Sequence, residues 1–186
     1  MTRPRHVGRF ASALLALGAT AALAAAGPET FTATASVKKG AASASAPVSV
    51  TVTRYATEAE TAAVRAAAAN GGPALSKALS ALGDAGFIQL GERKTPIKFA
   101  VERSTGAGRL ITILTAEPML FLGAGVPAAK PIAGFDVAIA MLDLDQSGGK
   151  GELAPAAKVG IDKGGAIVIE DYGATVMWLS GLARSK

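Results

Sequence analysis

The chain has no cysteine, and its only histidine is His6. His6 lies in the N-terminal segment that the sequence predicts to be removed, so the mature chain offers no disulfide, no Ser-His-Asp or Cys-His nucleophile, and no ordinary zinc, copper or haem ligation. Neither a G-x-S-x-G motif nor a phosphate-binding glycine loop is present. The sequence therefore predicts no catalytic residue, no metal and no cofactor, and it leaves open only carboxylate, Lys, Ser/Thr and Tyr chemistry.

The first 26 residues have the pattern of a signal peptide. Arg3, Arg5 and Arg9 form a basic start, and the apolar run over residues 10–26 ends in three alanines, the small residues that signal peptidase requires. An uncleaved anchor is the alternative, but the run is rich in alanine and short against the ~20 apolar residues of a membrane span. The sequence predicts cleavage after Ala26 and a mature chain that is secreted or periplasmic.

Removal of this segment changes the charge of the chain. The whole sequence carries 19 Lys/Arg against 14 Asp/Glu, and without the three early arginines 16 remain, a net charge of +2. Much of the positive net charge of the whole sequence therefore comes from the predicted signal peptide. The remaining charge gives little support for a nucleic-acid partner. No later run is long and apolar enough to span a membrane, so we expect a mature form that does not span one.

Residues 95–118 read as a central β-hairpin. Ile97, Phe99 and Val101 alternate with polar or small residues, which is the period of a half-buried strand. Residues 104–108 contain two glycines that suit a turn, and residues 109–115 are rich in β-branched side chains. The sequence predicts that Ile97, Phe99 and Val101 share one inward face.

Two short helices are predicted before this hairpin. Thr57 and Glu60 form a capping box ahead of an alanine-rich run. Pro73 then begins a second helix with an i, i+3, i+4, i+7 apolar stripe, closed by Gly83. Residues 38–46, which are small and polar, are expected to form a flexible low-complexity loop between the first two strands.

These patterns predict one α+β domain over residues 27–186. Strand segments with mostly short connections favour antiparallel pairing. We expect one large curved antiparallel sheet of about eight strands that rolls towards a barrel, with the helix pair inserted after the second strand.

Three residues are candidates for ligand binding. Arg103 continues the predicted inward face of the central hairpin, and Arg54 continues the alternating face of Val48, Val50 and Val52. An arginine at the end of an apolar strand face is suited to an anionic ligand at the sheet mouth; the alternative is a side chain that lies along apolar surface with its charge in water. Trp178 is either a core residue or a platform for a ligand.

Two acidic segments resemble known functional sites but do not match them. Residues 143–148 (DLDQSG) resemble the start of a calcium loop, but Ala154 stands where an EF-hand has its bidentate glutamate. Glu170 and Asp171 are adjacent on a predicted strand and so point to opposite faces, which does not suit the paired carboxylates of a glycosidase.

The chain resembles a family of uncharacterised secreted bacterial proteins. The segments that carry the resemblance are FTATA at 31–35, TRYATEAE at 53–60, ERSTGAGRLITILTAEP at 102–118, FDVAIAMLDLD at 135–145 and IEDYG at 169–173. The likeness covers residues 31–184. It implies export and a single domain, and it assigns no functional residue.

The leading functional hypothesis is an exported, non-enzymatic binding or envelope-associated module, with a small molecule or an envelope protein as partner. A hydrolase or isomerase that works through carboxylates without a metal is one alternative. A structural or protein-interaction domain is the other. A cluster of acids in one pocket favours the enzyme, and an apolar cavity with a few polar groups favours ligand binding.

Overall fold

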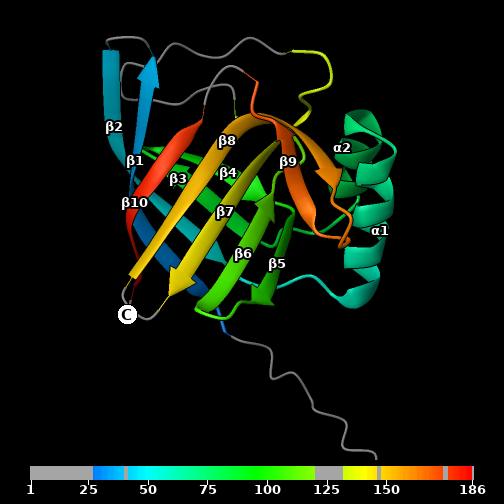
Figure 1. Cartoon of the computed structure of the whole chain (residues 1–186), viewed down its shortest axis with the longest axis horizontal. Helices are drawn as coiled ribbons and strands as arrows, with labels where there is room; N and C mark the ends of the chain where they lie inside the picture. Colours follow the sequence, from blue (N-terminus) through cyan, green and yellow to red (C-terminus); the bar gives the residue numbers. More distant parts are fainter. Residues whose placement is uncertain (1–26, 40–41, 120–131, 146–147, 174–175, 186) are drawn as a thin grey trace, which may run out of the picture.

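The computed structural model describes residues 27–39, 42–119, 132–145, 148–173 and 176–185; Ala26, the predicted cleavage position, lies outside them. The described residues form a large antiparallel sheet and two helices (Figure 1). The elements are β1 (Glu29–Lys39), β2 (Ala42–Val52), α1 (Glu58–Ala69), α2 (Gly72–Ser80), β3 (Gly86–Leu90), β4 (Arg93–Ile97), β5 (Phe99–Ser104), β6 (Gly108–Leu114), β7 (Val137–Asp145), β8 (Gly148–Ile161), β9 (Ile167–Asp171) and β10 (Met177–Arg184).

The sheet is nearly closed into a barrel. Its strands follow the order β4-β3-β2-β1-β10-β8-β7-β6-β5, and β9 pairs with β8 outside this path. β4 and β5 stand at opposite ends of the order, yet the chain passes from one to the other through Lys98, whose N–H donates to the Leu114 carbonyl at 3.0 Å. This junction brings the two ends together. The predicted α+β class, the rolled sheet and the helix pair after the second strand are confirmed, with ten strands in place of about eight.

One apolar layer fills the inside of the barrel. Alternate residues of every main strand contribute to it, because side chains on a strand point to opposite faces in turn. Its largest members are Phe31, Ile88, Ile97, Ile111, Ile113 and Leu142, each at most 1% exposed.

A second apolar layer lies outside the barrel, beneath the helix pair (Figure 1). It joins buried residues of both helices to the outer face of β5–β9, among them Val64, Leu75, Leu79, Phe99, Leu114, Ile139 and Val159. The sheet is therefore apolar on both faces here, as a sheet covered by helices requires.

The helix boundaries follow from local chemistry. The Thr57 hydroxyl accepts from the Glu60 N–H at 3.2 Å, and the Thr57 N–H donates to the Glu60 carboxylate at 2.8 Å, which confirms the capping box. Pro73 lies in the first turn of α2, where its missing N–H costs no helical hydrogen bond. Among the residues described, no helix is long and apolar enough to cross a membrane.

The expected loop over residues 38–46 is wrong in this structure. β1 continues to Lys39 and β2 starts at Ala42, with Lys39 and Ala42 paired across the ladder. The physical reason is an alternation of period two among small residues: Ala44 and Ala46 pack against the barrel interior, while Ser43 and Ser45 are exposed. Small side chains of this kind still alternate as a strand does.

The predicted inward face of the central hairpin is also corrected. Ile97 points into the barrel, but Phe99 and Val101 lie in the outer layer, and Arg103 is exposed beyond them. Strict alternation would place all four on one face. The strand changes its pairing partner at Lys98, from β3 to β6, and the inner face beyond this point begins with Ala100.

Candidate functional site

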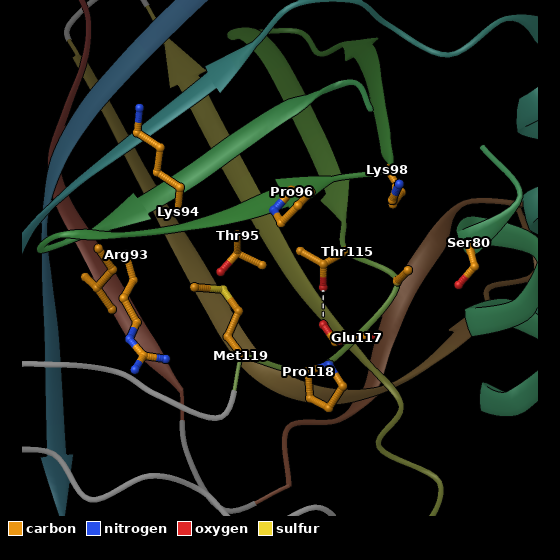
Figure 2. Close-up of a pocket in the computed structure, with 12 residues that line it drawn as sticks. Ser80, Arg93, Lys94, Thr95, Pro96, Lys98, Thr115, Glu117, Pro118 and Met119 are labelled. Atoms are coloured by element: carbon orange, nitrogen blue, oxygen red, sulfur yellow. Dashed lines mark hydrogen bonds between the residues drawn. The ribbon is translucent and has the colours of Figure 1, made fainter. Parts of the chain in front are cut away.

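An open cleft lies where the barrel is not closed by strand pairing. β4 is the last strand of the sheet order on its side, and its second edge faces the segment Thr115–Met119 that follows β6. The space between them, named here the β4 cleft, has a volume of about 800 Å³ (Figure 2). This volume is in the range of ~300–1,000 Å³ that is typical of small-molecule sites.

The far wall of the β4 cleft is fixed to three neighbouring elements. The Thr115 N–H donates to the Ala138 carbonyl of β7 at 3.0 Å, and the Met119 N–H donates to the Pro155 carbonyl of β8 at 2.7 Å. The Ser76 hydroxyl of α2 donates to the Ala116 carbonyl at 2.7 Å. A wall held in this way is preformed, so binding a ligand there does not require ordering it first.

Pro155, whose carbonyl accepts from Met119, lies at an irregularity of β8. The register between β7 and β8 shifts near it, because Val137 pairs with Ala157 whereas Ile139 pairs with Ala154. One extra residue on β8 is a β-bulge, a place where a proline is tolerated inside a sheet. The structure places this bulge in a central strand, because β8 lies between β10 and β7 in the sheet order.

The base of the β4 cleft is apolar and its rim is charged. Leu90 and Met119 are buried and belong to the inner apolar layer. Arg93 and Thr95 point from β4 into the same space as Met119, as Figure 2 shows. Glu117 is exposed on the opposite wall, where its backbone carbonyl accepts from the Thr115 hydroxyl.

Two lysines at the rim are already engaged. The Lys98 ammonium is 2.7 Å from the Asp84 carboxylate and also contacts the Leu82 carbonyl at 3.5 Å. The Lys94 ammonium stands 4.4 Å from the centroid of the Phe87 ring, on the outer face of the sheet, and points away from the cleft (Figure 2). Arg93 lines the cleft from the same strand, and its side chain points into the cleft (Figure 2).

Arg54, the first predicted ligand-binding residue, forms contacts within the fold. Its guanidinium contacts both Glu60 oxygens, at 3.0 and 3.1 Å, and donates to the Gly83 carbonyl at 3.0 Å. The hydrogen bond from the Thr57 N–H, and then the Arg54 guanidinium, lower the pKa of Glu60 against the opposing effect of burial. Arg54 thus joins the start of α1 to the segment after α2, and it does not line the β4 cleft.

The other two candidates also lie apart from the cleft. Arg103 is exposed near the end of β5. Trp178 is 57% exposed on the outer face of β10, so the core alternative is wrong and the platform alternative stays open. The structure brings none of the three predicted residues together.

A charged network closes the other end of the barrel. We name it the barrel-end network: Glu29, Tyr55, Glu102, Arg109 and Arg184. Glu29 is 3% exposed and accepts from both terminal nitrogens of Arg109, at 2.9 and 3.1 Å. Tyr55 donates to it at 2.6 Å and Arg184 lies 3.2 Å away. Arg109 also contacts Glu102 at 2.8 Å.

The partners of Glu29 keep it ionised. Burial raises its pKa, but the hydrogen bonds from Arg109 and Tyr55 and the charges of Arg109 and Arg184 outweigh burial and lower it. Burial raises the pKa of Tyr55, and the hydrogen bond to Glu29 raises it further. The phenol therefore stays a hydrogen-bond donor at neutral pH. Glu29 is thus not poised as a general acid, which requires a raised pKa.

Sequence reasoning missed this network, although a signal was present. Glu29 is in phase with the inward residues Phe31, Ala35 and Val37, and Arg109 is in phase with Ile111. A charge in phase with a buried strand face predicts a buried partner of opposite sign.

The described residues contain no group of three or more His, Cys, Asp or Glu side chains placed to hold a metal ion. Of the calcium-like segment 143–148, residues 146 and 147 lie outside the description. Searches of family models, curated proteins and solved structures found no match to this chain.

Proposed function

We propose that the chain is an exported, non-enzymatic binding protein whose β4 cleft holds a small molecule with an acidic group and an apolar body. The observation that carries the proposal is the cleft itself: a preformed space of about 800 Å³ with an apolar base at Leu90 and Met119 and a cation, Arg93, directed into it. Apolar lining with a few placed polar groups is the usual composition of a ligand site.

The ligand class follows from this composition. An arginine fork matches the geometry of a carboxylate or phosphate with two parallel hydrogen bonds. The apolar base favours an alkyl or aromatic body, which gains about 25 cal/mol per Å² of apolar area removed from water. Carboxylate catalysis is the weaker hypothesis, because the acids of the barrel-end network are tied to Arg109.

The proposal predicts selective binding of an acidic amphiphile. The probe is 11-(dansylamino)undecanoic acid, compared with its uncharged methyl ester, by fluorescence titration of the chain starting at Gly27. We expect saturable binding of the acid, at least tenfold weaker binding of the ester, and at least tenfold loss for Arg93→Glu. A charge-assisted hydrogen bond of ~1.5–3 kcal/mol corresponds to a tenfold effect or more.

The matched control is Arg65→Glu, the same charge reversal at an exposed position of α1. It should bind the acid as the wild type does. Equal losses in Arg65→Glu and Arg93→Glu, or equal affinity for acid and ester, would show that the β4 cleft does not select an acidic group.

The export part of the proposal predicts a defined start of the mature chain. Arg3, Arg5, Arg9, the apolar run and the three alanines favour cleavage after Ala26. N-terminal sequencing of material recovered outside the cytoplasm should begin at Gly27. A start at Met1 or Thr2 contradicts cleavage.

A further inference from the structure

Trp178 is the most exposed large apolar side chain among the residues described, at 57%. It lies on the outer face of β10, between Glu152 of β8 and Ser36 of β1, its partners across the two ladders. A single exposed tryptophan needs no explanation by itself. Trp178 differs because its cross-strand partner Glu152 also binds a second exposed aromatic residue, Tyr172.

A second exposed aromatic residue meets the same carboxylate. The Tyr172 hydroxyl donates to Glu152 Oε2 at 3.0 Å. Glu152 and Trp178 are direct cross-strand partners, and side chains in that relation have Cβ atoms about 4.5–5.5 Å apart. Of the three exposed large hydrophobic side chains described, two therefore flank Glu152, and the third, Ile132, lies in the segment before β7.

The Glu152 carboxylate retains acceptor capacity. Tyr172 occupies Oε2, and Oε1 has no hydrogen-bond donor among the described residues. Burial and the hydrogen bond to Glu152 raise the pKa of Tyr172, so the phenol remains the donor in this pair at neutral pH. A ligand hydroxyl can therefore donate to Oε1 without displacing Tyr172.

Hydroxyl side chains continue the surface on the other side of Trp178. Ser36 pairs with Trp178, and Thr34 pairs with Ser180, all on the outer faces of β1 and β10. Ser36 and Ser180 donate to backbone carbonyls at 3.4 Å, and each hydroxyl oxygen keeps its lone pairs as acceptors. The result is an aromatic ring bordered by a carboxylate on one side and hydroxyls on the other.

We propose that Trp178, Glu152 and Tyr172 form a docking platform for a β-1,4-linked polysaccharide, separate from the β4 cleft. Such a chain has ring faces of axial C–H bonds that stack on an indole, while its equatorial hydroxyls donate to a carboxylate and to serine. An aromatic side chain with an apolar body and polar neighbours supplies contact area at small entropic cost. A protein partner would favour a wider apolar patch, and here the neighbours of the ring are polar.

Trp178 is the only tryptophan of the chain, so its own emission reports on the platform. The experiment titrates the chain starting at Gly27 with cellohexaose and chitohexaose, with α-1,4-linked maltohexaose as the control sugar. We expect a saturable blue shift with at least one β-linked hexasaccharide and at least tenfold weaker binding of maltohexaose.

Variants assign the binding to these residues. In pull-downs on insoluble cellulose and chitin, Trp178→Ala should reduce affinity at least tenfold and Glu152→Gln about fivefold, while Trp178→Tyr stays within about threefold of the wild type. Ile132→Ala, which removes an exposed apolar side chain elsewhere, is the matched control and should bind normally.

Three results would overturn the proposal. One is an emission spectrum that neither β-linked sugar changes. Another is an equal loss in Ile132→Ala and Trp178→Ala. The third is a blue shift that grows with protein concentration in the absence of sugar, which would assign the platform to self-association.

Discussion

Phe99→Ala is expected to lower the free energy of unfolding by about 3–5 kcal/mol. Phe99 is 0% exposed in the outer apolar layer, where it packs with helix residues such as Leu75 and Leu79. Truncation removes the ring and leaves a cavity that fixed neighbours fill only in part. Because a domain of this size is typically stable by ~5–15 kcal/mol, the change is severe.

Urea unfolding of the chain starting at Gly27 measures this effect. Arg103→Ala, exposed on the same strand, is the control and should stay within about 0.5 kcal/mol of the wild type. Ile113→Ala tests the inner layer and should cost about 2–5 kcal/mol. Wild-type stability of Phe99→Ala would mean that the helix pair does not cover the sheet as described.

Arg109→Met is expected to destabilise the protein by about 3–5 kcal/mol. Methionine keeps an apolar stem of similar length, so the loss reports mainly on the charge. The change leaves Glu29, which is 3% exposed, without the two hydrogen bonds from Arg109. An ionised carboxylate buried without its partner is costly, although Tyr55 and Arg184 remain.

A double-mutant cycle with Glu29→Gln isolates the pair. The double variant should lose less than the two single variants added together, because the buried charge of Glu29 is removed together with its main partner. Lys158→Met breaks an exposed pair with Glu170, 3.6 Å apart, and should cost no more than about 1 kcal/mol. Additive losses in the cycle would rule out a coupled barrel-end network.

The pH dependence of the Glu29 contribution has a definite sign. Its pKa in the folded protein is lowered from the model-compound value of 4.5. The stability that this ionised carboxylate contributes is therefore fully present above about pH 4.5, and it is lost as the pH falls through the lowered folded pKa. The advantage of the wild type over Glu29→Gln should shrink in that acidic range.

Much of the fold could be predicted from the sequence because alternation and capping are local. The Thr57–Glu60 box and the strands around Phe99 and Ile113 needed no long-range information. Which face of β5 points inward could not be predicted, because Phe99 and the adjacent Ala100 are both buried, one in each apolar layer, and alternation alone does not say which layer is the inner one. The change of partner strand at Lys98 decides it.

The β4 cleft could not be predicted for a related reason. Arg93 and Met119 are far apart in the chain and line the same cleft because the sheet order of the described residues ends at β4. Arg54, by contrast, precedes the capping box by three residues, and its contact with Glu60 was within reach of local reasoning. The sequence left Trp178 as either a core residue or a ligand platform, and its 57% exposure on β10 is known only from the structure.

Native mass spectrometry of the protein purified from its own cells tests the central claim, that the β4 cleft holds a small acidic ligand, most directly. The account predicts that wild type and Arg65→Glu carry the same small-molecule adduct and that Arg93→Glu carries none. Release under denaturing conditions should yield a compound with one acidic group and an apolar body. A bare wild-type mass, or an adduct that Arg93→Glu retains in full, would contradict the account.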